Sequence, residues 1–318
     1  MYEFHPANPH DHFVRRTFDV VDHAKVLLVS LLPAALLTEI DLQSLRPTKE
    51  TFLSADEGEN RLDLLYTARL RGGDEVLIYL LFEHKSSIDR QIALQLLRYV
   101  LRILDWRNRN RQPLSVVIPL VLYHGDDAWD EPTSLRDKVQ ASPQLRCFVP
   151  DQGVIVVDFG RLAPGFLGAY PELEARIRTL QIARRSELAY ESVTGIFRLL
   201  SSWEKIHAQM DALNDIIIYL YTVFDARNLP WFEQAIRAGL QTDSEKPMPT
   251  CLEAMIEKGI EKGIERGVER GLMVGRIQTL QQFLRQSVTA EQELLGQSIE
   301  QLRALCLQLQ EQLGQQQS

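Results

Sequence analysis

The spacing of apolar residues predicts helices at the start of the chain and a β-hairpin after them. Apolar positions recur at helical intervals within residues 8–25, where Asn8 or Asp11 is placed to cap the helix, and again over 23–32. Residues 42–58 are polar, and we expect them to be irregular. Two apolar runs, 61–70 and 75–82, flank the breaker Arg-Gly-Gly-Asp, and this pattern predicts a β-hairpin.

Helical and strand patterns alternate beyond the hairpin. Residues 88–106 follow a helical period, 114–124 form a long apolar run, and 154–158 form a short one. Pro119 removes a backbone donor from the first of these two strands, which predicts an edge position or a bulge there. The order of helix, strand, strand, helix and strand predicts an α/β fold with a mixed sheet flanked by helices.

Strand signals end near residue 165, and the C-terminal half is predicted to be helical. Helical patterns run through 173–188 and 216–224, and this half either packs on the sheet or forms a helical subdomain. We divide the chain into a core of residues 1–165, a helical extension of 166–250, a repeat helix of 251–275 and a Gln- and Leu-rich C-terminal helix of 276–318.

The repeat helix has a period of four residues. Residues 256–271 are Ile-Glu-Lys-Gly twice, then Ile-Glu-Arg-Gly and Val-Glu-Arg-Gly. Because four is close to the 3.6 residues of a helical turn, each residue type forms a slowly drifting stripe. Each glycine lowers helix propensity by about 1 kcal/mol, so the helix needs tertiary or intermolecular support. We expect it to mediate self-association, which predicts a homo-oligomer.

Charge and composition exclude several classes of protein. The formal net charge is −8, from 35 Lys and Arg against 43 Asp and Glu, which excludes a histone-like protein that coats nucleic acid by bulk charge. Three cysteines without a CxxC pair indicate reduced thiols rather than a disulfide framework or a zinc site. The apolar run 26–37 is shorter than the roughly 20 residues that span a bilayer. We therefore expect a cytoplasmic protein without a membrane role.

Candidate chemistry is concentrated at the end of the predicted hairpin. Glu83 and Lys85 lie at i and i+2 on one strand, so they share a face, and they form the only Glu-x-Lys in the chain. Asp63 on the other strand joins them if residue 63 pairs with residue 83. That pairing requires a turn centred on Gly73 and a loop of odd length, with a positive φ at Gly72 or Gly73, or a bulge. A two-residue turn would put the two carboxylates on opposite faces.

Two carboxylates and a backbone carbonyl form a set of hard oxygen donors. Asp63, Glu83 and the carbonyl of His84 would hold Mg2+ or another divalent cation such as Mn2+ or Ca2+. The ion would activate a bound water and neutralise charge on a phosphodiester, while Lys85 would stabilise the transition state. We interpret the hairpin as a metal centre for phosphodiester hydrolysis; a solvated pair of Glu83 and Lys85 is the alternative.

A basic helix follows this predicted centre. Residues 90–111 contain six Arg against one acidic residue, a local charge of +5, which favours contact with a DNA backbone. The DNA-binding candidates are Arg90, Gln95, Arg98, Arg102 and His124. A solvated helix face is an equal alternative for Gln95. His124, at the end of a predicted strand, is either a phosphate contact or a hydrogen-bonded structural residue.

Several blocks together resemble the Rpn family, YhgA-like proteins described as recombination-promoting nucleases or transposases. They are His10-Asp11 with the following Phe13 and Phe18, Leu32-Pro33, Leu62-Asp63-Leu64, Phe82-Glu83-His84-Lys85-Ser86-Ser87, Leu97-Arg98-Tyr99 and the run Ile118-Pro119-Leu120-Val121-Leu122-Tyr123-His124-Gly125. The resemblance covers residues 10–165 in detail, and the C-terminal repeats match in style.

This resemblance implies a PD-(D/E)xK, restriction-endonuclease-like fold and a metal-dependent endonuclease that cleaves double-stranded DNA. It assigns Asp63, Glu83 and Lys85 to the catalytic centre, and Lys85 keeps the lysine that some relatives replace with glutamine. We accordingly expect an activity linked to DNA recombination or mobile elements, in a nucleoid-associated protein. A catalytically inactive nuclease fold that binds DNA or self-assembles is the alternative.

Overall fold

The computed structural model describes residues 9–48, 62–83, 91–125, 128–130, 132–183, 188–201, 206–224, 230–240, 250–295, 297 and 299–316. At some of these positions, including 62, 63 and 81–83, only the backbone is described. The chain forms two compact units, one of His10–Ile216 with Trp231–Pro247, and one of Met1–Pro9, Ile217–Pro230 and Met248–Ser318. The predicted metal centre lies in the first unit.

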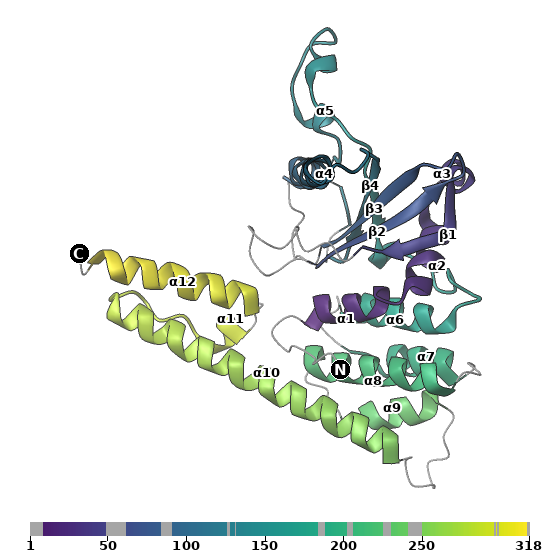
Figure 1. Ribbon diagram of the computed structural model, residues 1–318. Coiled ribbons are helices and arrows are strands. Elements are labelled where there is room, and N and C mark those ends of the chain that lie inside the picture. Colours follow the sequence, from purple (N-terminus) through teal and green to yellow (C-terminus); the bar gives the residue numbers. More distant parts are fainter. Residues whose placement is uncertain are drawn as a thin grey trace. The chain divides into compact units, whose positions relative to one another are not determined.

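A mixed sheet is the centre of the first unit (Figure 1). Within the described residues it has five strands in chain order: β1 (Ile40–Pro47), β2 (Leu62–Leu70), β3 (Glu75–Glu83), β4 (Val116–Tyr123) and β5 (Ile155–Asp158). Neighbours are antiparallel from β1 to β3 and parallel from β3 to β5. The parallel β3–β4 pair needs a crossover, which contains α4 (Ile92–Arg109). The predicted mixed α/β sheet is confirmed.

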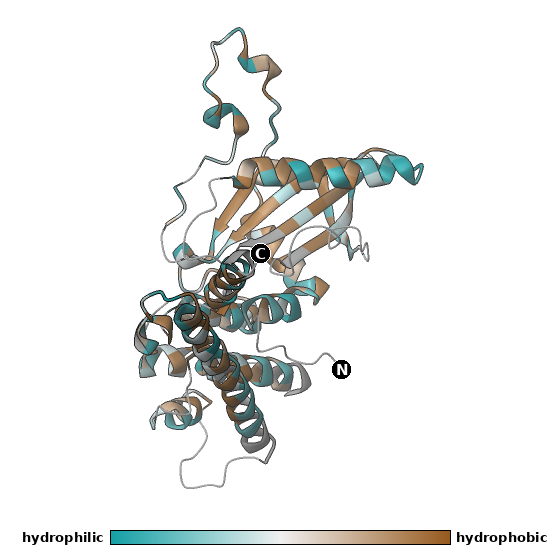
Figure 2. Cartoon of the chain, turned by 90° about the vertical axis from the view of Figure 1, so that its left-hand side faces the viewer, coloured by the Kyte–Doolittle hydropathy of each residue, from teal (hydrophilic) through white to brown (hydrophobic). Residues whose placement is uncertain are grey.

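The helix α4 covers one face of this sheet with its apolar side. Ile92, Leu96, Tyr99 and Ile103 recur at helical spacing and are buried in one core cluster. The strand residues in the same cluster are Leu65, Leu77, Tyr79, Val121 and Tyr123. Figure 2 shows α4 beside the sheet, with hydrophobic and hydrophilic positions along its length. The strand residues that face α4 are therefore the apolar ones, and this accounts for the alternation of buried apolar positions along the strands.

Pro119 lies on an inner strand, so the predicted edge strand is wrong. It pairs with Tyr79 of β3, but pairing between β4 and β5 begins one residue later, at Leu120. The missing N–H of proline therefore interrupts no described pairing with β5.

The strand β1 and the short helix α3 (Ala34–Glu39) are not indicated by the apolar pattern. In β1 the buried residues Ile40, Leu42 and Leu45 break a strict alternation, because the register with β2 shifts between Asp41 and Arg46. Extra residues in one strand hide the period of two. The predicted irregular structure is therefore wrong over 42–47.

The other helices of the first unit precede the sheet in sequence, lie between β4 and β5, or follow β5. The N-terminal pair is α1 (Pro9–Phe18) and α2 (Val21–Leu31), close to the predicted helices. Short elements are α5 (Leu135–Lys138), η2 (Arg146–Phe148) and η3 (Phe159–Arg161). Longer ones are α6 (Pro171–Ala183), α7 (Tyr190–Ser201), α9 (Phe232–Gly239) and α8 (Ile206–Phe224), of which the part from Ile217 belongs to the second unit. Up to Ile216, and again over Trp231–Pro247, the helical extension belongs to the same compact unit as the sheet.

Charged side chains connect four of these helices in a buried network. Arg16 of α1 and Arg176 of α6 donate to different oxygens of Asp215 on α8, over 2.7 and 2.9 Å. Glu172 of α6 lies 3.3 Å from Arg176 and 3.4 Å from Nε2 of His23 on α2. Each buried charge in the network thus has an oppositely charged neighbour, which burial of ions requires.

The second unit contains α10 (Thr250–Phe283), α11 (Glu291–Leu295) and α12 (Ile299–Gln316). The single helix predicted over 276–318 is wrong, because α10 ends at Phe283, and Arg285 just after it has a positive φ of 55°. The chain then returns, and α12 packs on α10 through Val274, Ile277, Leu302 and Leu309. Folding back buries an apolar stripe that a straight helix would leave exposed. None of the described helices is long and apolar enough to cross a membrane.

Candidate functional site

The β2–β3 hairpin places Asp63 and Glu83 on the same face of the sheet. Asp63 pairs with Leu81, and Glu83 is two residues beyond Leu81 on β3. Residues at i and i+2 share a face, so the two acidic residues are diagonal neighbours with Cα atoms about 7–8 Å apart. Leu65 follows Asp63 by two residues and Tyr79 precedes Glu83 by four, so both share the face of the acidic residues. Leu65 and Tyr79 belong to the core under α4. Positions 63 and 83 therefore belong to the face of the sheet that α4 covers.

The predicted register of this hairpin is wrong by two residues. Direct pairing of Asp63 with Glu83 requires a turn centred on Gly73, whereas the observed pairs are centred on Gly72. A shift of two residues keeps every side chain on its face, because side chains alternate with a period of two. The two residues are diagonal rather than directly opposite, and they still share a face.

The loop that sets this register has the predicted odd length. Leu70 donates its N–H to the carbonyl of Asp74 over 2.7 Å, which leaves 71–73 as a three-residue loop. Gly73 has a φ of +99°, a conformation that glycine adopts without steric cost. The odd loop with a positive φ at Gly73 is confirmed, and the two-residue turn is excluded.

The carboxyl ends of the parallel strands bring two more polar residues into line with Glu83. Glu83 of β3 pairs with Tyr123 of β4, and Tyr123 pairs with Asp158 of β5. Paired residues face the same side, and neighbouring strands lie about 4.8 Å apart. This edge of an α/β sheet is the usual place for a ligand site. His84, Lys85 and Arg90 lie outside the described residues.

Tyr123 has one orientation at this edge. Its side chain is fully buried, and Trp129 meets its ring edge-on, with 5.1 Å between centroids and 79° between planes. A Cβ atom at residue 125 would lie 2.6 Å from Cε2 of Tyr123 and closer still to the phenol carbon and oxygen. Gly125 has no positive φ. Position 125 therefore requires glycine because the phenol of Tyr123 approaches its backbone closely.

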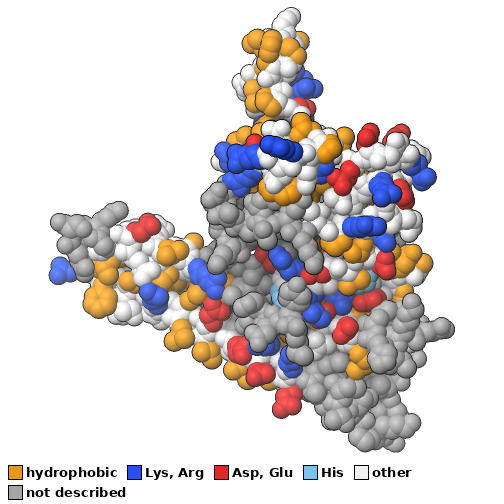
Figure 3. All heavy atoms as spheres, viewed as in Figure 1, with side chains coloured by type: hydrophobic (Ala, Val, Ile, Leu, Met, Phe, Trp, Pro, Cys, Tyr) orange, Lys and Arg blue, Asp and Glu red, His pale blue; other side chains and the backbone are white. Residues whose placement is uncertain are grey.

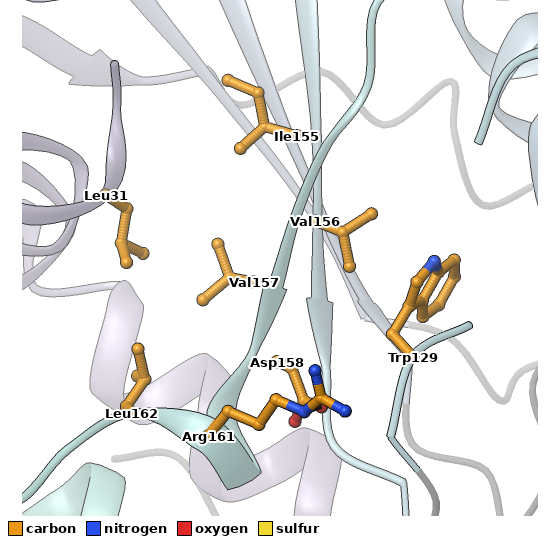
Figure 4. Close-up of a pocket in the computed structure, with 8 residues that line it drawn as sticks. All are labelled: Leu31, Trp129, Ile155, Val156, Val157, Asp158, Arg161 and Leu162. Carbon is orange, nitrogen blue, oxygen red and sulfur yellow. Dashed lines mark ion pairs between the residues drawn. The ribbon is translucent and has the colours of Figure 1, made fainter. Parts of the chain in front are cut away.

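Asp158 ends the row on β5 and is bound by its own turn. Its Oδ1 accepts the N–H of Gly160 over 2.9 Å, and its Oδ2 lies 3.6 Å from Nε of Arg161. Figure 4 shows Asp158 and Arg161 together at a shallow hollow that Trp129 also lines. Sequence reasoning missed Tyr123 and Asp158 as neighbours of the centre. The available signal was their position at the ends of two predicted strands.

Gln95 on α4 is buried, with 6% of its surface exposed. It occupies the turn between Ile92 and Tyr99, which both face the sheet. Within the described part of the chain, its Nε2 has no hydrogen-bond partner. The solvated face considered for Gln95 is therefore wrong. A buried amide hydrogen without an acceptor is costly, so it marks a place where a ligand or water is expected.

The arginines of α4 divide into exposed and engaged side chains. Arg98 is exposed, and Arg102 lies over Tyr99, with 5.7 Å from its guanidinium carbon to the ring centroid. Arg107 is buried and donates to Glu75 over 2.6 Å. Figure 3 shows Lys and Arg side chains gathered over the region of α4. Only part of the predicted positive charge is thus available to a ligand.

His124 is fully buried and contacts other parts of the protein. Its Nε2 bonds to the carbonyl oxygen of Leu180 on α6, and its ring lies 5.8 Å from that of His10 on α1. A side chain without exposed surface does not reach a DNA phosphate. The geometry contradicts a DNA contact for His124 and agrees with the structural alternative.

The donor set of the predicted metal centre depends on residues whose side chains are not described. Among the side chains that are described, no three His, Cys, Asp or Glu residues are grouped to hold a metal ion. Asp63 and Glu83 are described by their backbone only. The assignment of a metal to them therefore remains a prediction, founded on the strand register and on the chemistry of carboxylates.

Comparison with known proteins gives one family and several relatives. A family model described as "Putative transposase, YhgA-like" matches residues 8–211. Recombination-promoting nuclease RpnD of Escherichia coli O157:H7 is 28% identical over 170 residues, 49% of this chain and 65% of its own length. Recombination-promoting nuclease RpnA of Escherichia coli K12 is 28% identical over 120 residues, 37% of this chain and 41% of its own length.

A further relative from the same strain is named an inactive recombination-promoting nuclease-like protein, RpnE. It is 28% identical over 127 residues, 40% of this chain and 42% of its own length. The chain thus spans less than two thirds of the length of these three relatives. No solved structure matches it significantly.

Proposed function

Because the chain belongs to the YhgA-like family, we propose that it is a divalent-metal nuclease that hydrolyses phosphodiester bonds in double-stranded DNA. The observation that carries the proposal is the hairpin register, which puts Asp63 and Glu83 on one face at the end of β3. The names of RpnD and RpnA as recombination-promoting nucleases support the same activity and a link to DNA recombination.

We assign the sheet and α4 to a PD-(D/E)xK nuclease core. Three antiparallel strands, a helix across one face and a fourth strand parallel to β3 support this assignment. In such a core, Asp63 on β2 and Glu83 at the end of β3 supply the acidic groups of the centre, and Lys85, which follows in sequence, supplies the basic group. The strand register of the hairpin is what brings residues 20 positions apart in sequence together.

The donor set fits a hard divalent cation such as Mg2+ or Mn2+. Asp63 and Glu83 supply carboxylate oxygens, and the backbone of His84 supplies a carbonyl, the donors that these ions prefer. Such an ion, when bound, lowers the pKa of a water ligand and neutralises charge on a phosphate. The protein fixes the two carboxylates on adjacent strands, and Lys85 stabilises the charge that develops on the phosphate oxygens.

Contacts with the DNA backbone are assigned to α4, which follows the centre. Arg98 presents an exposed cation there, and Arg102 presents one held over Tyr99. A local basic surface attracts a polyanion even when the whole chain carries a net charge of −8. Acidic residues farther from the polyanion than a Debye length, about 10 Å, are screened by salt and repel it little. Gln95 is buried on α4, so a contact between Gln95 and DNA is not part of this proposal.

Incubation of the full-length protein with supercoiled plasmid tests this proposal. We expect nicked or linear plasmid in the presence of Mg2+ and intact plasmid when EDTA is in excess. Asp63→Ala and Glu83→Ala should both abolish cleavage, because each removes a carboxylate ligand. Cleavage that persists in EDTA contradicts the metal requirement, and cleavage by both variants contradicts the site.

An inactive nuclease fold that binds DNA is the second candidate. The similarity to RpnE, whose name describes an inactive protein, favours it. This candidate predicts that the protein retards DNA on a native gel without Mg2+-dependent cleavage. The presence of Glu83 and Lys85 in one Glu-x-Lys favours the active enzyme.

We also propose that α10 joins two copies of the chain. The exposed fraction rises along its apolar stripe, from 5% at Ile256 through 45% at Ile264 and 58% at Val268 to 71% at Leu272. A period of four on a helix of 3.6 residues per turn rotates the stripe by about 40° per repeat. The stripe therefore starts against the second unit's own core and ends in solvent, where a second α10 can cover it.

The glycines of α10 show the same division. A Cβ atom at Gly259 would lie 2.8 Å from Cδ2 of Tyr221, and one at Gly263 would lie 3.0 Å from its carbonyl oxygen. Gly271 and Gly275 have no such neighbour within 4 Å. The first two glycines admit Tyr221 of α8. The other two lower helix propensity by about 1 kcal/mol each, and close approach of a second helix would explain them.

A further inference from the structure

A long arm connects β4 to β5 and has no buried residue. It comprises residues 132–151, all of them described, and Figures 1 and 2 show it extending from the sheet beyond α4. Every residue from 142 to 148 is exposed. The arm therefore adds nothing to the hydrophobic core, and connections longer than about 12–15 residues that stay ordered usually have a function, most often in binding.

Asp151 closes the base of the arm. Its Oδ1 accepts a hydrogen bond from the hydroxyl of Ser134 over 2.9 Å, and its Oδ2 lies 3.5 Å from Nε of Arg136. The hydroxyl of Ser134 also accepts the N–H of Arg136 and caps the short helix α5. The two legs of the arm are thus joined at the base, which limits the positions that its tip, residues 138–150, can adopt.

The tip presents an apolar face to solvent. The N–H of Phe148, the last residue of η2, donates to the carbonyl of Leu145 over 3.0 Å. Residues at i and i+3 of a 3₁₀ turn lie on the same side, so Leu145 and Phe148 share a face. The exposed fraction is 57% for Leu145 and 78% for Phe148. Two large apolar side chains side by side in solvent indicate an interaction site.

The charge of the tip decides which partner fits this face. Lys138 and Arg146 are the only charged residues of the tip, so it carries two basic residues and no acidic one within a chain of net charge −8. Arg146 is exposed and stands between Leu145 and Phe148 in sequence. Figure 3 shows the arm rising from the region of α4, where Lys and Arg side chains gather. A polyanion therefore fits the tip better than a second copy of this acidic chain does.

We propose that the arm is a DNA-binding element. Arg146 binds a phosphate of the duplex, and Leu145 and Phe148 pack on the sugars and base edges that are exposed in a groove. Proteins that enter a DNA groove often combine arginine with an apolar wedge of phenylalanine or leucine. The inference rests on the proposed nuclease function, because that function requires a DNA duplex as the substrate, but it involves no contact with the metal centre.

The first test is the affinity of the full-length protein for a short fluorescent duplex, measured by anisotropy in EDTA so that the DNA stays intact. Phe148→Ala should weaken binding roughly 10-fold or more, because it removes the apolar area of one phenylalanine from the contact. Tyr170→Ala is the matched control, since Tyr170 is an aromatic residue with 52% exposure that precedes α6. It should bind DNA as the wild type does.

The salt dependence of the affinity tests the role of Arg146. The slope of log affinity against log salt concentration should fall in magnitude by about 0.9 in Arg146→Gln, the value for one phosphate contact in a duplex. Phe148→Ala should keep the wild-type slope, because phenylalanine carries no charge. Arg198→Gln, at an exposed position of α7, is the matched control and should keep both the slope and the affinity of the wild type.

Cys147 gives a readout that needs no variant. Its thiol is exposed at the tip, between Arg146 and Phe148 in sequence. A duplex bound to the tip should protect Cys147 from alkylation by N-ethylmaleimide, and mass spectrometry of the peptide that contains Cys147 measures the rate. The same rate with and without saturating DNA overturns the role of the arm.

The outcomes separate this role from the nuclease activity. Wild-type affinity and salt slope in both Phe148→Ala and Arg146→Gln overturn the DNA-binding arm, and metal-dependent cleavage by the wild type then leaves the nuclease proposal standing. A lower oligomer mass of Phe148→Ala with unchanged DNA affinity assigns the tip to a protein contact and also overturns the proposal. Absence of both DNA binding and cleavage in the wild type overturns the nuclease proposal and the arm with it.

Discussion

At the scale of single residues, the fit of Tyr123 over Gly125 is a tight steric constraint near the candidate centre. Replacement of Gly125 by alanine would put a methyl group 2.6 Å from a ring carbon that Trp129 holds in place. We predict that Gly125→Ala lowers the free energy of unfolding by about 1–3 kcal/mol, the usual cost of overpacking a core. Urea unfolding monitored by circular dichroism measures this loss.

Gly153→Ala is the matched control for that substitution. Gly153 is exposed, and no atom lies within 4 Å of the added methyl group. Its stability should stay within about 0.5 kcal/mol of the wild type, as for most surface substitutions. Equal stability of Gly125→Ala and Gly153→Ala would show that the phenol moves freely, and would remove the reason for the glycine.

The pairing of the two acidic residues shows what a residue pattern can predict. The apolar alternation correctly gives the face of Asp63 and Glu83, because a shift of one residue would turn every core side chain to the wrong side. A shift of two residues leaves each side chain on its face. The pattern is therefore equally consistent with a turn centred on Gly72 or on Gly73, and only the hydrogen bond between Leu70 and Asp74 decides.

Other polar residues depend on partners that are distant in sequence. His124 meets the carbonyl of Leu180, and Arg107 meets Glu75 over 2.6 Å. Leu180 and Glu75 are too far along the chain from His124 and Arg107 for a helix or strand pattern to relate them. The sequence is therefore equally consistent with exposed and with buried side chains at His124 and Arg107. The burial of Gln95 has the same origin, since it depends on how α4 is rotated against the sheet.

At the scale of elements, Glu172 connects two helices that are far apart in the chain. Burial raises the pKa of Glu172, but the hydrogen bond from His23 and the charge of Arg176 outweigh this and leave the pKa below its ordinary value of 4.5. A lowered pKa means that the ionised carboxylate stabilises the fold. That contribution is present above pH 4.5 and is lost as the pH falls through the lowered pKa.

We predict that Glu172→Gln lowers the free energy of unfolding at pH 7 by roughly 1–3 kcal/mol, the range for hydrogen bonds to charged groups. The difference from the wild type should shrink as the pH falls well below 4.5, where the wild-type carboxylate is protonated as well. Denaturant titrations at several pH values measure both effects. Glu191→Gln, at an exposed position of α7, should match the wild type throughout. A difference that grows toward acid would contradict the stated sign.

The exposed stripe of α10 leads to a prediction about assembly. Val268→Glu with Leu272→Glu should convert the oligomer to monomer, because carboxylates would then be buried at the helix contact. Leu307→Glu on α12, with 61% of Leu307 exposed, is the matched control and should keep the wild-type mass. Light scattering coupled to gel filtration measures the masses. A wild-type protein that is monomeric at micromolar concentration, or a double variant of unchanged mass, rules out this interface.

Two elements show why patterns fail where a chain bends or folds back. β1 escapes detection because inserted residues between Asp41 and Arg46 break its alternation. The C-terminal segment has helical periodicity throughout. The end of α10 at Phe283 depends on the positive φ of Arg285, and arginine, unlike glycine, is not a residue type that predicts a helix end. The repeat helix itself, with its strict period, is described over its whole predicted length.

At the scale of the whole molecule, the family match and the first compact unit nearly coincide. The family model covers residues 8–211, and the larger part of this unit runs from His10 to Ile216. The match therefore includes the helices α6 and α7 as well as the sheet. The boundary at residue 165 stays a prediction. The charged network of Arg16, Arg176 and Asp215 connects the start of this unit to its end.

The central claim is that two carboxylates on one hairpin hold the metal of a DNA nuclease. The most direct measurement is the rate of Mg2+-dependent plasmid nicking by Asp63→Asn and Glu83→Gln, compared with Asp74→Asn. Asp74 lies at the turn of the same hairpin, is exposed, and receives the same chemical change as Asp63. We predict that the first two variants lose more than about 100-fold in rate while Asp74→Asn matches the wild type. Nicking by Asp63→Asn or Glu83→Gln at the wild-type rate would contradict the claim.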